Sequence, residues 1–154
     1  MITEEKEWVQ KNLVHIYEFS SKHRLFNLLQ DYLCELINNN PGLFLKSNNI
    51  EIIEKSMLLT ILKSNSLELD EIKIWDYVIQ WGIGQNKEIL GKNISEWNKD
   101  DFKKMKNNLK DIIPLIRFDF YKKIRPYKKA FDEDVYEEIH QYYLDVNRNL
   151  NYYF

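Results

Sequence analysis

Apolar residues recur every three or four positions along almost all of this 154-residue chain, while strict apolar–polar alternation is nearly absent. This spacing gathers apolar side chains on one face of an α-helix, whereas a half-buried strand requires alternation. The clearest example is Ile74, Val78 and Trp81, which follow Asp70, a residue type that caps helices. The pattern therefore predicts an all-α fold. The short loops between successive helices favour antiparallel neighbours, which predicts a stack of antiparallel helical hairpins.

Helix-breaking residues divide the periodic segments and set the expected helix ends. A first helix is expected from Thr3 to the Ser20–Ser21 pair, with a buried face that includes Val9. Gly82 and Gly84 are expected to end the helix that follows Asp70, by adopting positive φ. A second helix is expected with the apolar residues Leu25, Leu29, Leu33, Leu36 and Ile37, followed by a buried plug of Phe44 and Leu45. A third helix is expected with Met57, Leu58, Ile61 and Leu62. Further along the chain we expect a helix capped by Asn98, with Phe102, Met105, Leu109 and Ile112, and a last helix with Val135, Ile139 and Tyr142.

Charge and cysteine content narrow the class of protein. The formal net charge is −2, so the chain has no overall field that would draw it to nucleic acid or to an anionic membrane. Its single cysteine, Cys34, excludes an internal disulfide and suits a reducing compartment. No apolar run approaches the ~20 residues of a membrane-spanning helix, and the N-terminus has no apolar signal segment. We expect a cytoplasmic or nuclear protein with neither nucleic acid nor a membrane as partner.

The residue types that carry chemistry do not form a recognisable site. No histidine has the helical spacing to another histidine or to Cys34 that a metal site uses, and Cys34 is expected to be a buried packing residue. Adjacent carboxylates such as Asp100 and Asp101 suit helix caps and polar faces better than an acid–base pair. The basic stretch 122–129 is followed at once by acidic residues that would neutralise it. We therefore predict no catalytic residues, no metal and no cofactor.

Three stretches together resemble the BACK domain family, in the fungal-type form that lies between a BTB domain and a Kelch or TLDc domain. The first is residues 70–82, the second is residues 113–118 and the third is residues 125–129, which reads Arg-Pro-Tyr-Lys-Lys. The resemblance covers approximately Trp8 to Leu144. The residues that carry it are Trp75, Val78, Trp81, Gly82, Pro114, Arg117, Phe118, Arg125, Pro126 and Tyr127.

The resemblance implies a scaffold rather than an enzyme. BTB–BACK proteins are similar to substrate adaptors of cullin–RING ubiquitin ligases, in which the BACK segment spaces and orients the substrate-binding domain. We accordingly expect one BACK-like domain over residues 1–144, with residues 1–20 as part of a first hairpin next to a missing BTB domain, and a tail or linker over residues 145–154. The expected partners are the flanking domains and a cullin, and the residues expected to face them are Trp8 and Val9.

An alternative remains open at this point. The chain also fits a free-standing helical protein that binds other proteins or associates with itself, unrelated to ubiquitination.

Overall fold

The computed structural model describes residues 2–116, 124–134, 136–137 and 140–141. Within these residues helices are the regular structure and no strand occurs, which confirms the predicted all-α class. None of the described helices combines the length and the apolar character needed to cross a bilayer. The chain divides into two compact units, residues 1–81 and residues 82–154, and we describe each by itself.

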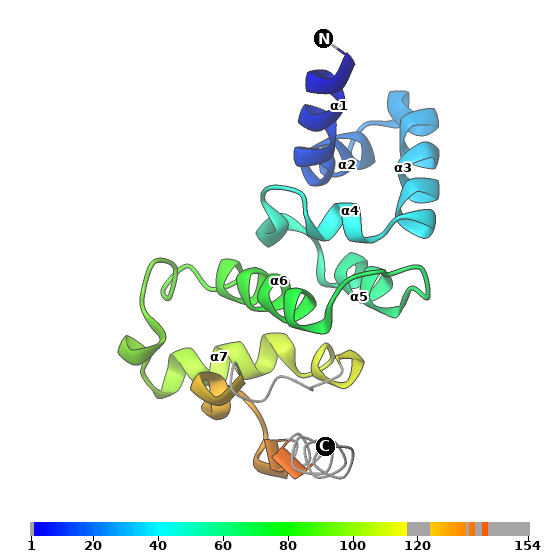
Figure 1. Ribbon diagram of the computed structural model, residues 1–154. Helices are drawn as coiled ribbons and strands as arrows, with labels where there is room; N and C mark the ends of the chain where they lie inside the picture. Colours follow the sequence, from blue (N-terminus) through cyan, green and yellow to red (C-terminus); the bar gives the residue numbers. More distant parts are fainter. Residues whose placement is uncertain (1, 117–123, 135, 138–139, 142–154) are drawn as a thin grey trace, which may run out of the picture. The chain divides into compact units, whose positions relative to one another are not determined.

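The first unit contains helices α1 to α5 and most of α6 (Figure 1). Helix α2 packs against α3, and both contact the short helix α4. Its elements are α1 (Ile2–Lys11), α2 (Leu13–Ser21), the 3-10 helix η1 (Arg24–Phe26), α3 (Asn27–Asn39), α4 (Gly42–Leu45), η2 (Ile50–Ile52), α5 (Lys55–Lys63) and α6 (Glu71–Gly84), which extends beyond the unit's last residue.

The core of the first unit follows the predicted apolar stripes. The predicted plug is confirmed, because Phe44 and Leu45 are 1% and 0% exposed. The stripe of α5 is also buried at Leu58 and Ile61. The second predicted helix is only partly right: Leu33 is buried in α3, whereas Leu25 lies in η1 and is 95% exposed.

The first predicted helix is wrong, because it is two helices that meet at Asn12. The hydroxyl of the buried Ser47 donates to the Lys11 carbonyl (2.9 Å) and accepts from the Val14 N–H (3.3 Å). The Asn48 N–H donates to the same Lys11 carbonyl at 2.7 Å. A side chain that inserts into the hydrogen-bond ladder in this way kinks a helix. Val9 lies in the separate helix α1. Its side chain is therefore exposed and not buried as predicted.

The second unit is organised around α7 (Lys99–Leu109), and its apolar face is buried as predicted. The unit also contains η3 (Ile94–Glu96), η4 (Ile113–Leu115) and η5 (Arg125–Ala130), which packs against α7. The described residues near its end, 133–134, 136–137 and 140–141, have helical backbone. The predicted core residues of the last helix, Val135, Ile139 and Tyr142, and the tail 145–154, lie outside the described residues.

The predicted end of α6 is confirmed, because the helix ends at Gly84, but the predicted positive φ is wrong. Gly82 lies inside the helix, and Gly91 is the glycine with positive φ in the described part of the chain. Gly82 lies close to side chains of α7 instead. An added Cβ there would lie 2.8 Å from the Met105 sulfur and 3.3 Å from Leu109 Cδ2, so the end of the Met105 side chain would have to shift to admit it.

Candidate protein-docking surface

Among the described residues, the groups that carry chemistry do not converge. No cluster of three or more His, Cys, Asp and Glu side chains is arranged to hold a metal ion in the described ranges. Burial raises the pKa of the half-buried Tyr17 phenol above its ordinary value of 10.0. A hydrogen bond to Glu88 raises the pKa of Lys104 above its ordinary value of 10.5. Neither shift produces the reactive form of its group.

The first unit has an apolar groove of about 540 Å³ between α1–α2 and α3. Its floor contains Leu13 and Leu33, which are almost fully buried. Its wall includes Tyr32, which is 60% exposed. The groove is lined by Val9, Gln10, Leu13, Ile16, Leu29, Tyr32, Leu33, Leu36, Asn40 and Leu43.

Two other hollows in the first unit are less suited to a protein partner. One, of about 440 Å³, has a mostly polar lining that includes Asn39, Asn65 and Lys46. The other, of about 260 Å³, lies beside Tyr17 and Glu54. Since apolar burial provides most of the free energy of protein association, the apolar groove is the stronger candidate.

The break at Asn12 shapes one side of the groove. It allows α1 to leave the direction of α2, and the Asn12 amide then holds the Trp8 carbonyl through its Nδ2 atom at 2.8 Å. Trp8 itself is 61% exposed, and Val9 lines the groove while 42% exposed. Both residues that were predicted to face a partner are therefore on the accessible surface.

A second apolar feature, which we call the tip, lies at the turn from α2 to α3. The rings of Phe19, His23 and Phe26 pack together, with centroids 4.7 Å apart for Phe19 and His23 and 5.5 Å apart for Phe19 and Phe26. Beside them, Leu25 and Leu28 are 95% and 87% exposed. The tip consists of these five residues. A large apolar group that protrudes in this way marks an interaction site more often than an isolated exposed leucine does.

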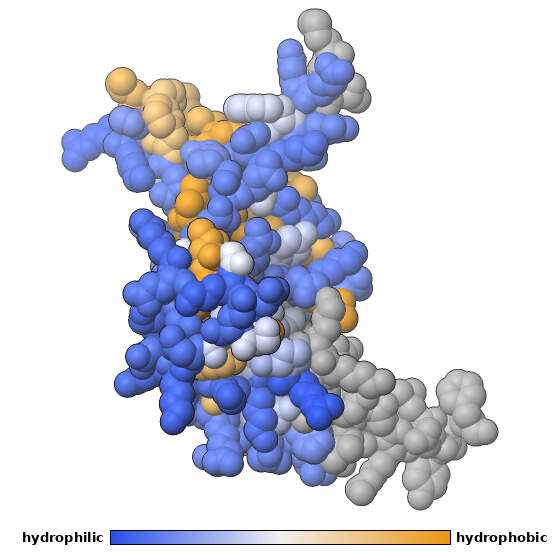
Figure 2. All heavy atoms as spheres, turned by 90° about the vertical axis from the view of Figure 1, so that its left-hand side faces the viewer, coloured by the Kyte–Doolittle hydropathy of each residue, from blue (hydrophilic) through white to orange (hydrophobic). Residues whose placement is uncertain are grey.

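Figure 2 shows apolar side chains that reach the surface of the first unit, at the level of α2 and the beginning of α3. Charged and polar side chains surround them in the same view. Contiguous apolar surface with a polar rim is the arrangement typical of a protein-interaction site.

Each feature has charged side chains of both signs near it in the sequence. The tip is flanked by Lys22 and Arg24, and Lys22 also pairs with Glu18 at 3.7 Å. Exposed acidic side chains, Glu4 and Glu5, lie on α1, the helix whose Val9 and Gln10 line the groove. Asp31 and Glu35 are exposed on α3, and Glu7 pairs with Lys11 at 3.9 Å.

The residues of α6 that carry the resemblance to BACK domains are core residues. Trp75, Val78 and Trp81 are 2% exposed or less. The indole Nε1 of Trp81 donates to the Ile53 carbonyl oxygen at 2.8 Å, which fixes the loop before α5 to α6. These residues hold the first unit together and do not reach its surface.

The other residues that carry this resemblance are spread over the second unit. Pro114 in η4 and Arg125 and Pro126 in η5 are exposed, whereas Tyr127 is half-buried. The Tyr127 ring packs edge-on against Trp97, with centroids 6.0 Å apart. Arg117 and Phe118 lie outside the described residues.

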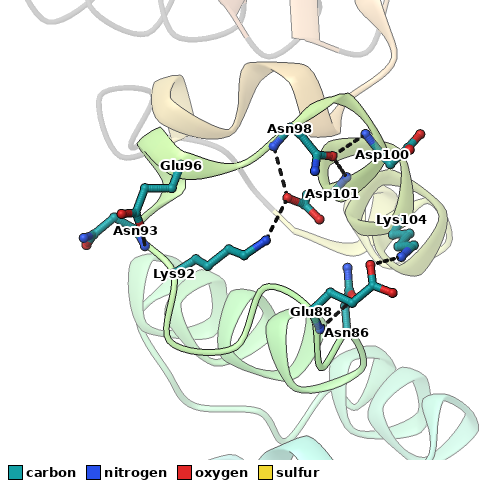
Figure 3. Close-up of polar contacts among 9 residues, drawn as sticks. All are labelled: Asn86, Glu88, Lys92, Asn93, Glu96, Asn98, Asp100, Asp101 and Lys104. Atoms are coloured by element: carbon teal, nitrogen blue, oxygen red, sulfur yellow. Dashed lines mark hydrogen bonds and ion pairs between the residues drawn. The ribbon is translucent and has the colours of Figure 1, made fainter.

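The densest polar cluster in the second unit caps helices (Figure 3). Asn98 Oδ1 accepts from the N–H groups of Asp100 and Asp101 at 2.8 and 2.9 Å, while Asp101 accepts from the Asn98 N–H at 3.0 Å. This reciprocal arrangement confirms the predicted cap. Asp101 is not solvated as expected, however: it is 1% exposed and lies 3.5 Å from the Lys92 ammonium. The cluster therefore stabilises the start of α7.

Sequence reasoning missed the tip and misplaced two residues. Leu25 was expected in a buried stripe, yet it is exposed because η1 precedes α3 and changes the helical register. Cys34 was expected to be buried, yet its side chain is exposed on α3. The available signal was local: five large apolar or aromatic residues between 19 and 29 exceed what one helix face can bury.

No protein-family model matches this sequence, and the comparisons with curated proteins and with solved structures also give no match.

Proposed function

We propose that this chain is a non-enzymatic protein-interaction module whose first unit binds another protein through the apolar groove. The observation that carries the proposal is the groove itself, an apolar hollow with an exposed tryptophan beside it and a polar rim. Burial of such a surface is worth about 25 cal/mol for each Å² of apolar area removed from water. A partner that fills the groove would obtain much of its affinity there.

The narrower form of the proposal follows from the BACK resemblance. In that form the chain is the spacer segment of a cullin–RING ubiquitin-ligase adaptor, and it orients a substrate-binding domain. The ordered set of residues around Trp81, Pro114 and Tyr127 supports this reading. The burial of Trp75, Val78 and Trp81 is consistent with their expected role in holding neighbouring helices together.

A binding assay with purified proteins tests both forms. The chain is immobilised and exposed to purified cullins and to BTB, Kelch and TLDc domains. Val9→Asp places a charge in the groove, and Leu90→Glu is the matched control because Leu90 is an apolar residue, 65% exposed, in the second unit. Binding that Val9→Asp abolishes and Leu90→Glu preserves supports the interaction module, and binding to a cullin supports the adaptor. Binding that both variants preserve would place the interaction elsewhere and contradict the role of the groove.

A further inference from the structure

We propose that a stripe of lysines along α7, in the second unit, binds a short acidic segment of a partner protein. The inference goes beyond the proposed function, because it uses the second unit and does not involve the groove. The stripe consists of Lys99, Lys103, Lys106 and Lys110, the last of which is the C-cap of α7. These positions follow the spacing i, i+4, i+7 and i+11, which places side chains on one face of a helix.

Most of the stripe lacks an acidic partner. Lys99, Lys103 and Lys110 are exposed, and none of them pairs with any residue that the structure describes. Lys106 is partly exposed and pairs with Asp132, which follows η5. Three exposed cations on one helix face therefore remain available to an anion from outside the chain.

An aromatic ring holds a fifth cation beside the stripe. Helix η5 packs against α7 (Figure 1), and its Lys129 ammonium lies over the Phe102 ring, 5.5 Å from the centroid. Phe102 comes three residues after Lys99 and four before Lys106. Residues at these spacings are neighbours on a helix surface, so the Phe102 ring lies between the two lysines. The charge of Lys129 is thus added at the edge of the stripe.

The stability of α7 does not account for this arrangement. Like charges three or four residues apart on a helix repel each other and destabilise it. Cations near a helix C-terminus interact favourably with the helix dipole, which explains Lys106 and Lys110. Lys99 is the first residue of α7, where the dipole disfavours a cation. A bound anion would relieve the repulsion along the whole stripe.

The surroundings of the stripe favour a peptide over other polyanions. Single-stranded nucleic acid stacks its bases on aromatic rings. Here Phe102 and Tyr136 are buried, and Lys129 and Lys128 lie over their rings. A long duplex or an anionic bilayer is repelled by the rest of the chain, whose formal net charge is −2. A short peptide stays within the Debye length of about 8 Å and is attracted by the stripe.

The length of the stripe sets the length of the acidic segment. Lys99 and Lys110 are about 16 Å apart along the helix axis, at a rise of 1.5 Å per residue. An extended chain covers about 3.3 Å per residue, so about five or six residues span the stripe. Acidic side chains repel one another and keep such a segment extended.

A labelled peptide of eight glutamates is the probe, and fluorescence anisotropy measures its binding to the full chain at low salt. The stripe variant carries Lys99→Gln, Lys103→Gln and Lys110→Gln. The control variant removes three exposed lysines elsewhere, through Lys46→Gln, Lys63→Gln and Lys87→Gln. The two variants have the same net charge, so a difference between them reports the position of the lysines.

The stripe variant should raise the dissociation constant of the peptide roughly tenfold or more, whereas the control should raise it less than about twofold. Wild-type affinity should fall as the salt concentration rises, and a peptide of eight glutamines should not bind. Circular dichroism should show that both variants retain the helical fold.

The opposite results overturn the inference. It is wrong if the wild-type chain does not bind the glutamate peptide at low salt, or if the two variants weaken binding equally. An oligothymidylate or phosphatidylserine vesicles that bind more tightly than the peptide, and that only the stripe variant loses, would make the stripe a nucleic-acid or lipid site. That result would also contradict a peptide partner. The proposed function is judged separately, by the assay with purified partner proteins in which Val9→Asp is decisive.

Discussion

The hydroxyl of Ser47 accepts a hydrogen bond from the backbone N–H of Val14, 33 residues earlier, and so occupies the break between α1 and α2. The same hydroxyl donates to the Lys11 carbonyl on the other side of the break. Both Ser47 and Val14 are buried, so neither the donor nor the acceptor has easy access to water. This one side chain therefore satisfies the backbone groups that the interruption of the helix leaves free.

Ser47→Ala should destabilise the chain by about 1–3 kcal/mol, because it leaves the buried Val14 N–H without its acceptor. Urea denaturation followed by circular dichroism measures the change. The matched control is Ser21→Ala, since Ser21 is exposed and its hydroxyl donates only to the Glu18 carbonyl of its own helix. The control should change the free energy of unfolding by less than about 0.5 kcal/mol. Equal losses in the two variants would show that the Ser47 bridge does not hold the break.

This contact also explains why part of the fold was not predictable from the sequence. The buried faces of α5, α6 and α7 were predicted correctly, because a 3.6-residue period requires only neighbours along the chain. The break at Asn12 depends on Ser47, which lies 36 residues after Lys11, and nothing local to the first helix marks it. Periodicity therefore predicts one continuous helix for an apolar segment that contains no glycine or proline.

The candidate docking surface also depends on contacts that local sequence patterns do not describe. Trp8 and Val9 were expected to face a partner on the basis of the BACK resemblance, and both are exposed, whereas helical periodicity had placed Val9 in a buried face. The groove depends on how α1 and α3 are placed across the break, which helical periodicity does not describe. Gly82 illustrates the reverse error: glycine near a helix end suggests a positive φ, whereas here its use is the close approach of Met105. Local sequence preferences cannot distinguish a terminating glycine from a packing glycine.

Trp81→Ala should cost roughly 3–5 kcal/mol, as large-to-small substitutions of core aromatics do. Trp81 is 2% exposed and its indole donates to the Ile53 carbonyl. Trp8→Ala, the same substitution at a residue that is 61% exposed, is the control and should have a much smaller effect on thermal unfolding. Trp81→Phe should fall between them, because it keeps most of the packing and loses the hydrogen bond. A midpoint that Trp81→Ala leaves unchanged would contradict the position of α6 described here.

Asn98→Ala should destabilise the second unit by about 1 kcal/mol, because it removes the acceptor for the N–H groups of Asp100 and Asp101. The control is Asn107→Ala, which changes the same residue type at an exposed position inside α7. Alanine is the better helix former there, so the control should be neutral or slightly stabilising. Hydrogen exchange of the first α7 amides should increase in the Asn98 variant only. Similar exchange in both variants would mean that the cap does not limit fraying.

Tyr17 should make stability decline at alkaline pH. Burial raises the pKa of its phenol above the ordinary value of 10.0, so the folded state favours the neutral form. Its contribution is fully present below the unfolded pKa of about 10 and is lost as the pH rises through the higher folded pKa. Tyr17→Phe should therefore flatten the fall in stability above pH 10, measured by urea denaturation at several pH values. A slope that Tyr17→Phe leaves unchanged would contradict the assignment to Tyr17.

Gly82→Ala tests the close packing of α6 and α7, because two opposing effects must be weighed there. Alanine in a helix interior gains roughly 0.5–1 kcal/mol over glycine, whereas overpacking a core costs roughly 1–3 kcal/mol. An added Cβ would lie 2.8 Å from the sulfur of Met105, which is fully buried, so we expect a net loss of about 1 kcal/mol. Gly42→Ala is the control, since the nearest atoms of Leu69 would be at an ordinary 3.4 Å.

A double-mutant cycle identifies Met105 as the cause of that loss. Met105→Ala alone should destabilise the chain by about 2–5 kcal/mol through the cavity it leaves. With Met105 shortened, the contact at 2.8 Å is removed and the 3.3 Å contact with Leu109 Cδ2 remains, so adding Gly82→Ala should become close to neutral or stabilising. The coupling free energy between the two positions should therefore be favourable and close to the overpacking cost. If Gly82→Ala costs the same in both backgrounds, Met105 is not what restricts position 82, and the glycine is required for another reason.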